Sequence, residues 1–376
     1  MISMFGIKGM IEELKFREDD RIAVIAPHPD DECLGAAAAL ILVPEKTDIY
    51  VLTDGSHGNK DVSYEEEAKI RRQQFEAEME IVKPHSYHWL GWEDTTLSSN
   101  SKAVRSIDFT QYTKIFLPWE ESLHPDHRAA ADLCRIAIWT QKAKAECFSY
   151  EVTAAFRKPT HYIDITALEQ KKRELIRCHK DQWMIEDMTM ALNYYEGARL
   201  FLYKDVHCAE TYLKIDVFDG SETPDLLAKL WTVKRDPEVL DNLTRQNIQI
   251  KRVMSMDISK VYSFIEENFA KQWADESLPA LISGDCYVAV REREILGFLA
   301  FDSTAKSYIG PGGVHPSARG CGIFRALFLR AFISMIEKGY RYAILGQANP
   351  ATRLCLKDMV EMQPITNSIG SYAEHI

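Results

Sequence analysis

Two short clusters of histidine and carboxylate residues stand out in the first half of this 376-residue sequence. The first is His28-Pro29-Asp30-Asp31, and the second is His124-Pro125-Asp126-His127. Each follows an apolar segment typical of a buried strand and opens a segment rich in helix-forming residues. Imidazole and carboxylate groups together suit Zn²⁺ or another borderline divalent ion. Three such ligands would leave a position open for water, so the clusters predict a hydrolytic metal centre.

The same residues have a purely structural interpretation. Asp30 and Asp31 would cap a helix, and His124 and His127 would be ordinary surface histidines. Short motifs specify function loosely, so either cluster alone leaves this interpretation open. Two clusters of histidine and aspartate, each at a strand end, favour the metal hypothesis.

The segments around the clusters predict a layered α/β domain that positions them. Short apolar runs at 21–26, 49–53 and 112–118 are typical of buried parallel strands. Residues 64–82 and 127–143 have helical patterns between or after them. This alternation predicts a doubly wound, mostly parallel sheet, in which ligands bind at the carboxyl ends of the strands.

A change of composition divides the chain into two domains. We expect a first domain over 1–218, a polar linker with helical segments but no strand over 219–247, and a second domain over 248–376. The pattern of the second domain predicts a hairpin over 286–301, a glycine-rich loop and a helix over 322–338. Its pattern predicts a mixed α/β fold.

Composition limits the classes of partner and compartment. The chain has 45 Lys+Arg against 56 Asp+Glu and a formal net charge of −11, which argues against nucleic-acid binding. Its eight cysteines form no CxxC pair, a pattern that indicates reduced thiols in the cytoplasm. We find no signal peptide at the start and no apolar window of membrane-spanning length. We therefore expect a soluble, cytoplasmic protein without membrane insertion.

Several segments together carry a family resemblance over about residues 20–215. Ala26-Pro-His-Pro-Asp-Asp-Glu32 and Leu123-His-Pro-Asp-His-Arg128 resemble the PIG-L/LmbE-type family of metal-dependent de-N-acetylases. Further segments match the family in the same order: Thr53-Asp54-Gly55, Leu90-Gly91 with Asp94, Lys172 with His179-Lys-Asp-Gln182, and Ala209-Glu-Thr-Tyr212.

The resemblance implies a Rossmann-like sheet and a metal-dependent hydrolase. Its reaction would remove an N-acetyl group from a small-molecule amino sugar or glycoconjugate. Carried over by position, the ligands of Zn²⁺, or of another divalent ion such as Fe²⁺, would be His28, Asp31 and His127. Glu32 receives no role.

The resemblance also implies catalytic roles and shows two departures. Asp30 would be the general base that activates water. His124 would stabilise the oxyanion and protonate the leaving amine, with Asp126 orienting it; these are the roles that amide hydrolysis needs. Gln74 replaces the acid of the family's RxxE segment, and Asp181 replaces the serine of its HxSQ segment.

A glycine-rich turn between a predicted strand and helix marks the second domain. In Val314-His-Pro-Ser-Ala-Arg-Gly-Cys-Gly-Ile-Phe324, glycine lets backbone N–H groups approach an anion such as a pyrophosphate. The structural alternative is a tight bend. With the hairpin and Asn349-Pro350 after the next strand, residues 248–365 resemble the GNAT-type acyl-CoA-dependent N-acyltransferases.

This second resemblance implies acetyl-CoA or another acyl-CoA as cofactor. The expected contacts are Val314, Arg319, Gly320, Cys321, Gly322, Ile323 and Asn349. Phe324 occupies the final small position of the family's turn, and the tyrosine expected after Asn349 is absent.

Three functional hypotheses follow. The preferred one is a bifunctional enzyme that hydrolyses an N-acetyl group and transfers an acyl group from acyl-CoA to an amine. The alternative is a deacetylase with a non-catalytic GNAT-fold module for binding or dimerisation, which would allow a homo-oligomer. A third makes the first domain a hydrolase of another amide, such as a mycothiol-like or bacillithiol-like conjugate.

Overall fold

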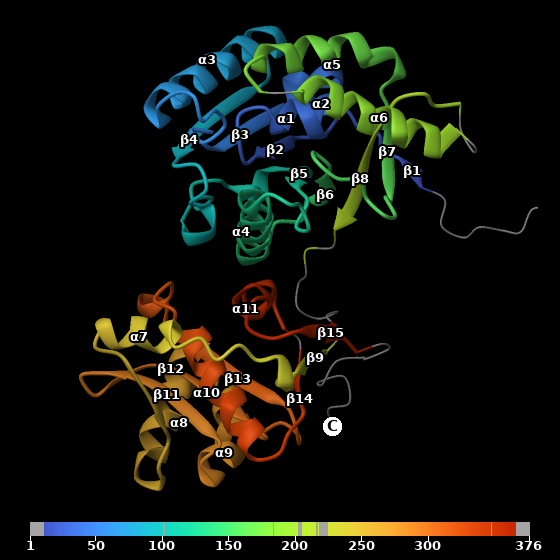
Figure 1. The fold of residues 1–376 in the computed structure, drawn as a ribbon. Coiled ribbons are helices and arrows are strands. Elements are labelled where there is room, and N and C mark those ends of the chain that lie inside the picture. Colours follow the sequence, from blue (N-terminus) through green and yellow to red (C-terminus); the bar gives the residue numbers. More distant parts are fainter. Residues whose placement is uncertain are drawn as a thin grey trace, which may run out of the picture. The chain divides into compact units, whose positions relative to one another are not determined.

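The fold comes from a computed structural model with two compact units, one within residues 1–217 and the other within 218–376 (Figure 1). The structure describes residues 11–100, 102–182, 184–201, 205–215, 217, 225–346 and 348–365. Among these residues, no helix has both the length and the apolar character needed to cross a bilayer.

The first unit is built on an eight-stranded sheet. The strands lie in the order β1-β7-β8-β6-β5-β2-β3-β4. The five from β6 to β4 are mutually parallel, and β8 is antiparallel to both of its neighbours. The bounds are β1 (Glu12–Glu13), β2 (Ile22–Ala26), β3 (Thr47–Thr53), β4 (Ser86–Trp92), β5 (Lys114–Pro118), β6 (Glu146–Tyr150), β7 (His161–Asp164) and β8 (Ala209–Ile215). The predicted mostly parallel sheet is confirmed.

Helices cover both faces of this sheet, as a doubly wound fold requires. Figure 1 shows α1, α2, α3 and α5 on one face and α4 on the other. The bounds are α1 (Asp31–Gly35), α2 (Ala37–Leu42), α3 (Tyr64–Val82), α4 (Pro125–Gln141), α5 (Glu169–Ile176) and α6 (Ile185–Phe201). Alternate residues of β2 supply the two cores: Val24 faces the α2 and α3 side, and Ala23 and Ile25 face α4.

The two predicted clusters meet because β2 pairs with both β3 and β5. The chain leaves β2 toward β3 on one side, and β5 lies on the other, so a topological switch point falls between β2 and β5. Val24 lies opposite Phe116 in the parallel register. The loops after Ala26 and Pro118 therefore start at one edge of the sheet, where ligands bind in such folds.

A buried ion pair holds the two short helices that follow β2. Lys172 Nζ donates to the Leu34 carbonyl at 2.8 Å and to Glu210 Oε1 at 2.7 Å. Glu210 Oε2 accepts from the Ala38 N–H at 3.1 Å. Both charged side chains are buried. Side chains from α5 and β8 thereby fix α1 and α2 against the sheet.

Close packing explains the glycine that ends α1. A Cβ at Gly35 would lie 2.0 Å from Tyr150 Cδ2, which no side chain tolerates. Tyr150 is itself fixed, because its hydroxyl donates to the Ile25 carbonyl at 2.7 Å. A larger residue at position 35 would push α1 away from the strand that carries the first cluster.

The second unit contains a four-stranded antiparallel sheet and a three-stranded one. The orders are β10-β11-β12-β13 and β14-β9-β15, and one parallel bridge, Tyr308 to Ile344, connects them. The strands are β9 (Leu226–Lys229), β10 (Gln249–Arg252), β11 (Cys286–Arg291), β12 (Glu294–Phe301), β13 (Ile309–Val314), β14 (Tyr342–Leu345) and β15 (Met362–Pro364). The helices are α7 (Glu238–Arg245), α8 (Ile258–Asn268), α9 (Lys271–Ser283), α10 (Ile323–Glu337) and α11 (Pro350–Leu356). The predicted hairpin and the helix expected over 322–338 are both present.

The expected strandless linker over 219–247 is wrong. Residues 219–224 lie outside the described residues, but β9 and α7 follow within the second unit. β9 lies between β14 and β15, with Leu226 and Ala228 buried. Four residues between polar segments give little strand signal, and both pairing partners lie more than a hundred residues away.

The Lys172 ion pair makes a testable prediction about stability. Lys172→Met should leave Glu210 as a buried, unpaired charge and lower the free energy of unfolding of the first unit by about 3–5 kcal/mol. Urea denaturation measures this change. The control Lys171→Met removes a half-exposed lysine from the same helix, and it should change stability by less than about 0.5 kcal/mol. Equal effects of the two variants would contradict the role given to Lys172.

Candidate metal centre

Asp30 has a backbone conformation that differs from that of a normal helix cap. Its φ angle is 140°, and its side chain makes no capping hydrogen bond. Arg71 Nη2 instead donates to Asp30 Oδ2 at 2.8 Å and also to the Pro29 carbonyl. A non-glycine residue at positive φ is costly and persists where its surroundings over-determine it, commonly at functional sites. The helix-cap interpretation therefore does not describe Asp30.

Asp31 lies at the centre of the three predicted metal ligands. Its Oδ2 lies 3.2 Å from His28 Nδ1 and 3.2 Å from His127 Nε2. Ligand atoms about 2.0–2.1 Å from a tetrahedral ion lie roughly 3.4 Å apart, so each of these two distances is close to the spacing in such a site. The group of histidines whose ligand atoms all lie within 4.8 Å of one another contains His124 in place of Asp31. Asp31 and His127 are both buried, which excludes the surface-histidine interpretation for His127.

The second ring nitrogen of His28 faces two carboxylates. His28 Nε2 lies 3.2 Å from Asp94 Oδ1 and 3.6 Å from Asp126 Oδ2. A carboxylate behind a ligating histidine fixes the ring and its tautomer. The sequence matched Asp94 to the family motif without a role, and the structure places it where it can orient His28.

Asp126 does not contact His124 in the expected way. Its carboxylate accepts from the backbone N–H groups of Thr95 at 2.7 Å and Leu97 at 3.3 Å. Only its backbone N–H reaches His124, donating to Nδ1 at 3.3 Å. His124 thereby caps α4 through its ring. With Nδ1 occupied as an acceptor, the neutral ring carries its proton on Nε2.

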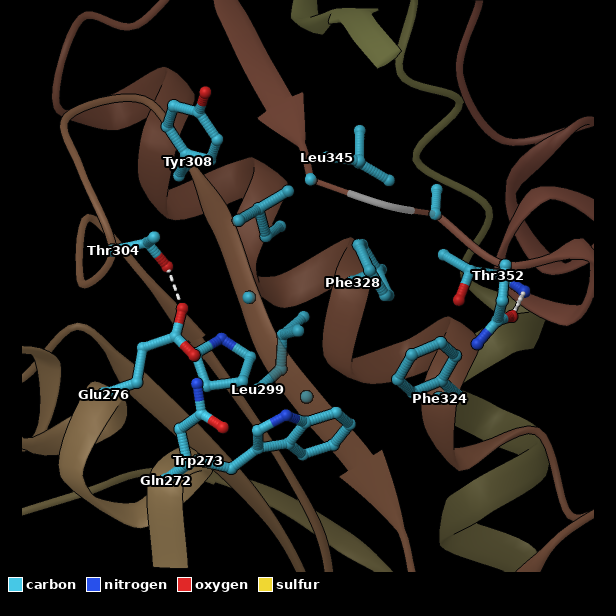
Figure 2. A pocket seen from close by; sticks show the side chains of 17 residues that line it. Gln272, Trp273, Glu276, Leu299, Thr304, Tyr308, Phe324, Phe328, Leu345 and Thr352 are labelled. Carbon is cyan, nitrogen blue, oxygen red and sulfur yellow. Dashed lines mark hydrogen bonds between the residues drawn. The ribbon is translucent and has the colours of Figure 1, made fainter. Parts of the chain in front are cut away.

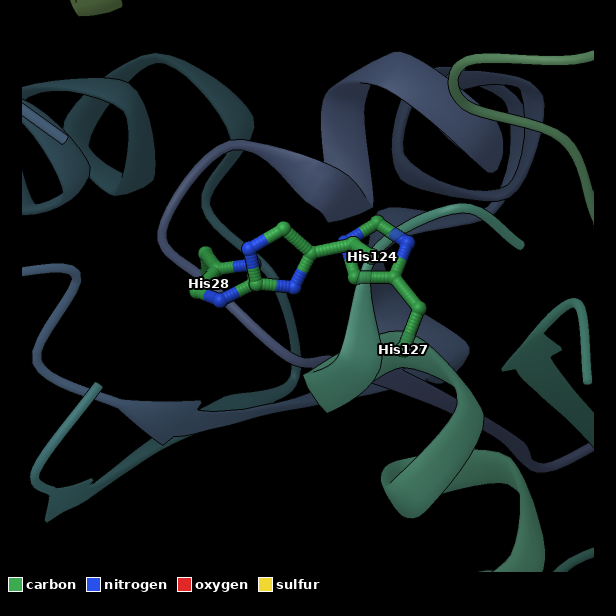
Figure 3. A group of neighbouring side chains, drawn as sticks. All are labelled: His28, His124 and His127. Atoms are coloured by element: carbon green, nitrogen blue, oxygen red, sulfur yellow. The ribbon is translucent and has the colours of Figure 1, made fainter. Parts of the chain in front are cut away.

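Figure 3 shows the three histidine rings together: His127 from α4, His124, which caps α4, and His28 from the loop after β2. The His28 and His124 ring centroids lie 4.5 Å apart, nearly perpendicular to each other. Nitrogen atoms of His28, His124 and His127 all lie within 4.8 Å of one another. The structure thus brings residues from both sequence clusters into one group of potential ligands.

Strong electrostatic coupling marks this group. Burial opposes protonation of His28, but the nearby carboxylates of Asp126, Asp31 and Asp94 raise its pKa well above 6.5. Burial would raise the pKa of Asp31, yet His127 and His28 hold it well below its usual range. Burial, together with the nearby charges of His28 and His127, lowers the pKa of His124 to about 4. Neighbouring groups with pKa values pushed in opposite directions are typical of functional sites.

The two departures from the family pattern contact each other. Gln74 Nε2 donates to Asp181 Oδ2 at 2.6 Å. One turn before Gln74 on α3 lies the buried Arg71, whose Nε and Nη1 have no hydrogen-bond partner. Arg71 is the arginine of the altered RxxE segment, Arg71-Arg-Gln-Gln74. That segment by itself does not predict the contact of Arg71 with Asp30, which lies 41 positions earlier in the chain.

The predicted acyl-CoA residues of the second unit lie mainly on one turn. Val314 ends β13, and Arg319 Nε donates to its carbonyl at 3.3 Å. Gly320 and Gly322 both have φ of 83°, and Gly322 directly precedes α10. Cys321 accepts a side-chain hydrogen bond through its carbonyl, and Ile323 is the buried first residue of α10.

A pocket of about 310 Å³ lies beside this turn, between β13 and β14. Figure 2 shows Trp273, Phe324 and Phe328 on its walls. Of the seven predicted residues, Asn349 lines it, and its side chain accepts from the Thr352 N–H at 2.9 Å. Among the described lining residues, Glu276 is the only charged one.

The first unit contains a family match. Residues 23–138 match the model of the PIG-L family, which is described as GlcNAc-PI de-N-acetylase. This confirms the resemblance for that segment, which includes both histidine clusters. No curated protein matches the chain.

Three similar solved structures are distant. N,N'-diacetylchitobiose deacetylase from Pyrococcus horikoshii is 20% identical, with 53% of this chain and 84% of that one covered and a TM-score of 0.46. 4-Carboxy-2-hydroxymuconate hydratase from Pseudomonas putida is 17% identical, with 52% of this chain and 96% of that one covered and a TM-score of 0.43. The zinc-inhibited form of teicoplanin deacetylase is 13% identical, with 52% of this chain and 99% of that one covered and a TM-score of 0.40. At these identities and TM-scores, the likeness carries no conclusion on function.

A buried acid near the sheet predicts how stability changes with pH. Burial raises the pKa of Glu151 to about 8, although hydrogen bonds from the Phe156 N–H and the Thr211 hydroxyl oppose the shift. Between its unfolded pKa of about 4.5 and about 8, the folded state holds more protons than the unfolded state. The free energy of unfolding of the first unit should therefore fall as pH rises through this window.

Glu151→Gln should flatten this dependence, because the variant has no proton to lose. Urea midpoints of the first unit at pH 5, 6, 7 and 8 measure it. Glu80→Gln, on the exposed face of α3, should keep the wild-type slope. A variant slope as steep as that of the wild type would show that Glu151 does not contribute.

Proposed function

We propose that the first unit is a divalent-metal-dependent N-deacetylase acting on an N-acetylated amino sugar or glycoconjugate. The observation that carries this proposal is the position of Asp31 Oδ2, 3.2 Å from one nitrogen of each of His28 and His127. The family match over residues 23–138 supports the reaction class, since the family description names a de-N-acetylase.

His28, Asp31 and His127 are the proposed ligands of the ion. Two nitrogens and one carboxylate oxygen suit Zn²⁺, and Fe²⁺ is compatible with the same donors. Once bound, such an ion polarises a carbonyl group and lowers the pKa of water. Asp94 and Asp126, behind His28 Nε2, hold the first ligand in its orientation.

Asp30 is the proposed general base. It precedes Asp31 directly, and its carboxylate makes no capping hydrogen bond to the described residues of the helix that follows. Arg71 holds Oδ2, which keeps the carboxylate in one orientation. Asp30 removes a proton from the attacking water as the new C–O bond forms. The same proton is then transferred to the amine nitrogen as the C–N bond breaks. Acetate and a free amine are the products.

His124 is the proposed oxyanion donor. Because its Nδ1 accepts from the Asp126 N–H, its Nε2–H is available to the carbonyl oxygen of the substrate. This geometry supports the expected role of His124 in stabilising the oxyanion. Asp126 contributes to the orientation of His124 through its backbone, and its carboxylate braces the 95–97 segment and faces His28.

Metal content and acetate release test the proposal together. The His28→Ala/His127→Ala double variant should lose the catalytic ion and all acetate release, whereas Asp30→Asn should keep the ion and lower the rate by about 10²–10⁴-fold. Mass spectrometry of a panel of N-acetylated sugars and nucleotide sugars measures loss of the acetyl group. His207→Ala removes an exposed histidine of the same unit and serves as the control. Full metal retention in the double variant would overturn the ligand assignment.

We propose that the second unit binds an acyl-CoA and transfers its acyl group to an amine. The supporting observation is the pocket between β13 and β14, at the first turns of α10. The strands share one bridge, at Tyr308 and Ile344, and the pocket is lined beyond it by residues of both. A non-catalytic module of the same fold is the alternative, since Phe324 replaces a small residue and lines this pocket.

Calorimetric titration of the full chain with acetyl-CoA distinguishes these possibilities. Binding that weakens at least tenfold in Arg319→Ala, with thiol release when an amine is added, supports the transferase. Binding without thiol release for any amine of a broad panel supports the binding module. Absence of binding would reject both acyl-CoA hypotheses. Arg330→Ala removes an exposed arginine of α10 and is the charge-matched control.

A further inference from the structure

A second group of potential ligands lies in the first unit, apart from the three proposed above. It consists of Glu32 and Cys33 on α1, Glu78 on α3, and His179 at the end of a short 3₁₀ helix, Arg177–His179. All four residues have 0% of their surface exposed. Ligand atoms of Cys33, Glu78 and His179 lie within 4.8 Å of one another.

Direct contacts link the group internally and to Asp30. His179 Nε2 lies 2.8 Å from Glu78 Oε2. Glu32 Oε2 also accepts from the Asp30 N–H at 3.2 Å, and Cys33 Sγ donates to the Asp30 carbonyl at 3.2 Å. The group therefore lies directly behind the segment that carries the proposed general base.

The group lacks partners that a buried polar cluster requires. Glu32 Oε1, Glu78 Oε1 and His179 Nδ1 are buried and have no hydrogen-bond partner within the part of the chain that the structure describes. Each unpaired polar atom of this kind costs about 1–3 kcal/mol. Among the described residues, no lysine or arginine lies within ion-pair distance of Glu32 or Glu78, whereas Asp30 and Glu210 each have such a partner.

Two buried carboxyl groups that have no Lys or Arg partner among the described residues need a positive species beside them. A shared proton is one solution, and a cation is the other. The presence of a thiol and an imidazole beside both carboxyls favours a cation, because a proton between Glu32 and Glu78 makes no use of Cys33. Cys33, Glu78 and His179 offer one sulfur, one oxygen and one nitrogen within 4.8 Å of one another. With a carboxylate oxygen from Glu32, the residue before Cys33, the donors would form a tetrahedral set for Zn²⁺.

We propose that Glu32, Cys33, Glu78 and His179 bind a second, structural Zn²⁺ in the first unit. Binding releases the protons of the thiol and of the carboxyl groups to solvent, and the ion replaces them. Four protein ligands leave no open position, as in closed structural sites. The ion would tie α3 and the 177–179 segment to α1, behind Asp30. This site does not depend on the proposed deacetylase activity.

The test uses the full chain produced in zinc-supplemented medium and washed free of loose metal. Elemental analysis should find two zinc ions per chain. Zinc K-edge absorption should show sulfur at about 2.3 Å, with one sulfur for every two ions. Because the first centre has no sulfur ligand among its proposed residues, the sulfur signal reports on the second site alone.

Variants assign each ion to its site. Cys33→Ala should lose one ion and the sulfur signal, and the His28→Ala/His127→Ala variant should lose the other ion and keep that signal. Cys134→Ala removes another fully buried thiol of the same unit and should retain both ions. Wild-type protein without a zinc–sulfur signal would overturn the proposal and leave a shared proton between Glu32 and Glu78. The wild-type spectrum tests the second zinc site even if Cys33→Ala fails to fold. Loss of deacetylation alone would neither support nor contradict the second site.

Discussion

The parallel pairing of β2 with β5 is the constraint on which the candidate centre depends. It brings the loop after Ala26 and the loop after Pro118 to one edge of the sheet, although about a hundred residues separate them. Asp31 from the first loop can then lie between His28 and His127. Neither histidine cluster contains a complete ligand set, so the proposed chemistry exists only where the two strands are neighbours.

Buried charged residues hold the segments at this edge of the sheet, and their burial costs desolvation free energy. Asp30 pairs with Arg71, and Lys172 pairs with Glu210 while also binding the carbonyl that ends α1. Removing one partner of a buried pair costs more than the pair gains, so these contacts act as positional constraints more than as sources of stability. Among the described residues, Glu32 has no such cationic partner, and its Oε1 has no hydrogen-bond partner. This is the reason for proposing a metal ion in the group around it.

The second unit shows how a correct local prediction can leave function open. The hairpin, the glycine turn and α10 lie where the sequence pattern predicts them. The pocket nevertheless combines residues from α9, β13, α10 and the segment after β14, and most of the predicted acyl-CoA contacts do not line it. β9 was missed because its pairing partners, β14 and β15, come from distant parts of the chain.

The sequence by itself determined the alternation of strands and helices, the two clusters of metal-type ligands and the family resemblance that residues 23–138 confirm. These features depend on local periodicity and on short motifs, which a single chain displays directly. Only the tertiary structure decided that Asp94 lies beside His28, that Gln74 hydrogen-bonds to Asp181, and that Glu32 and Glu78 are both buried. Such contacts depend on which elements become neighbours, and burial then sets the pKa values and the unpaired atoms that no local pattern encodes.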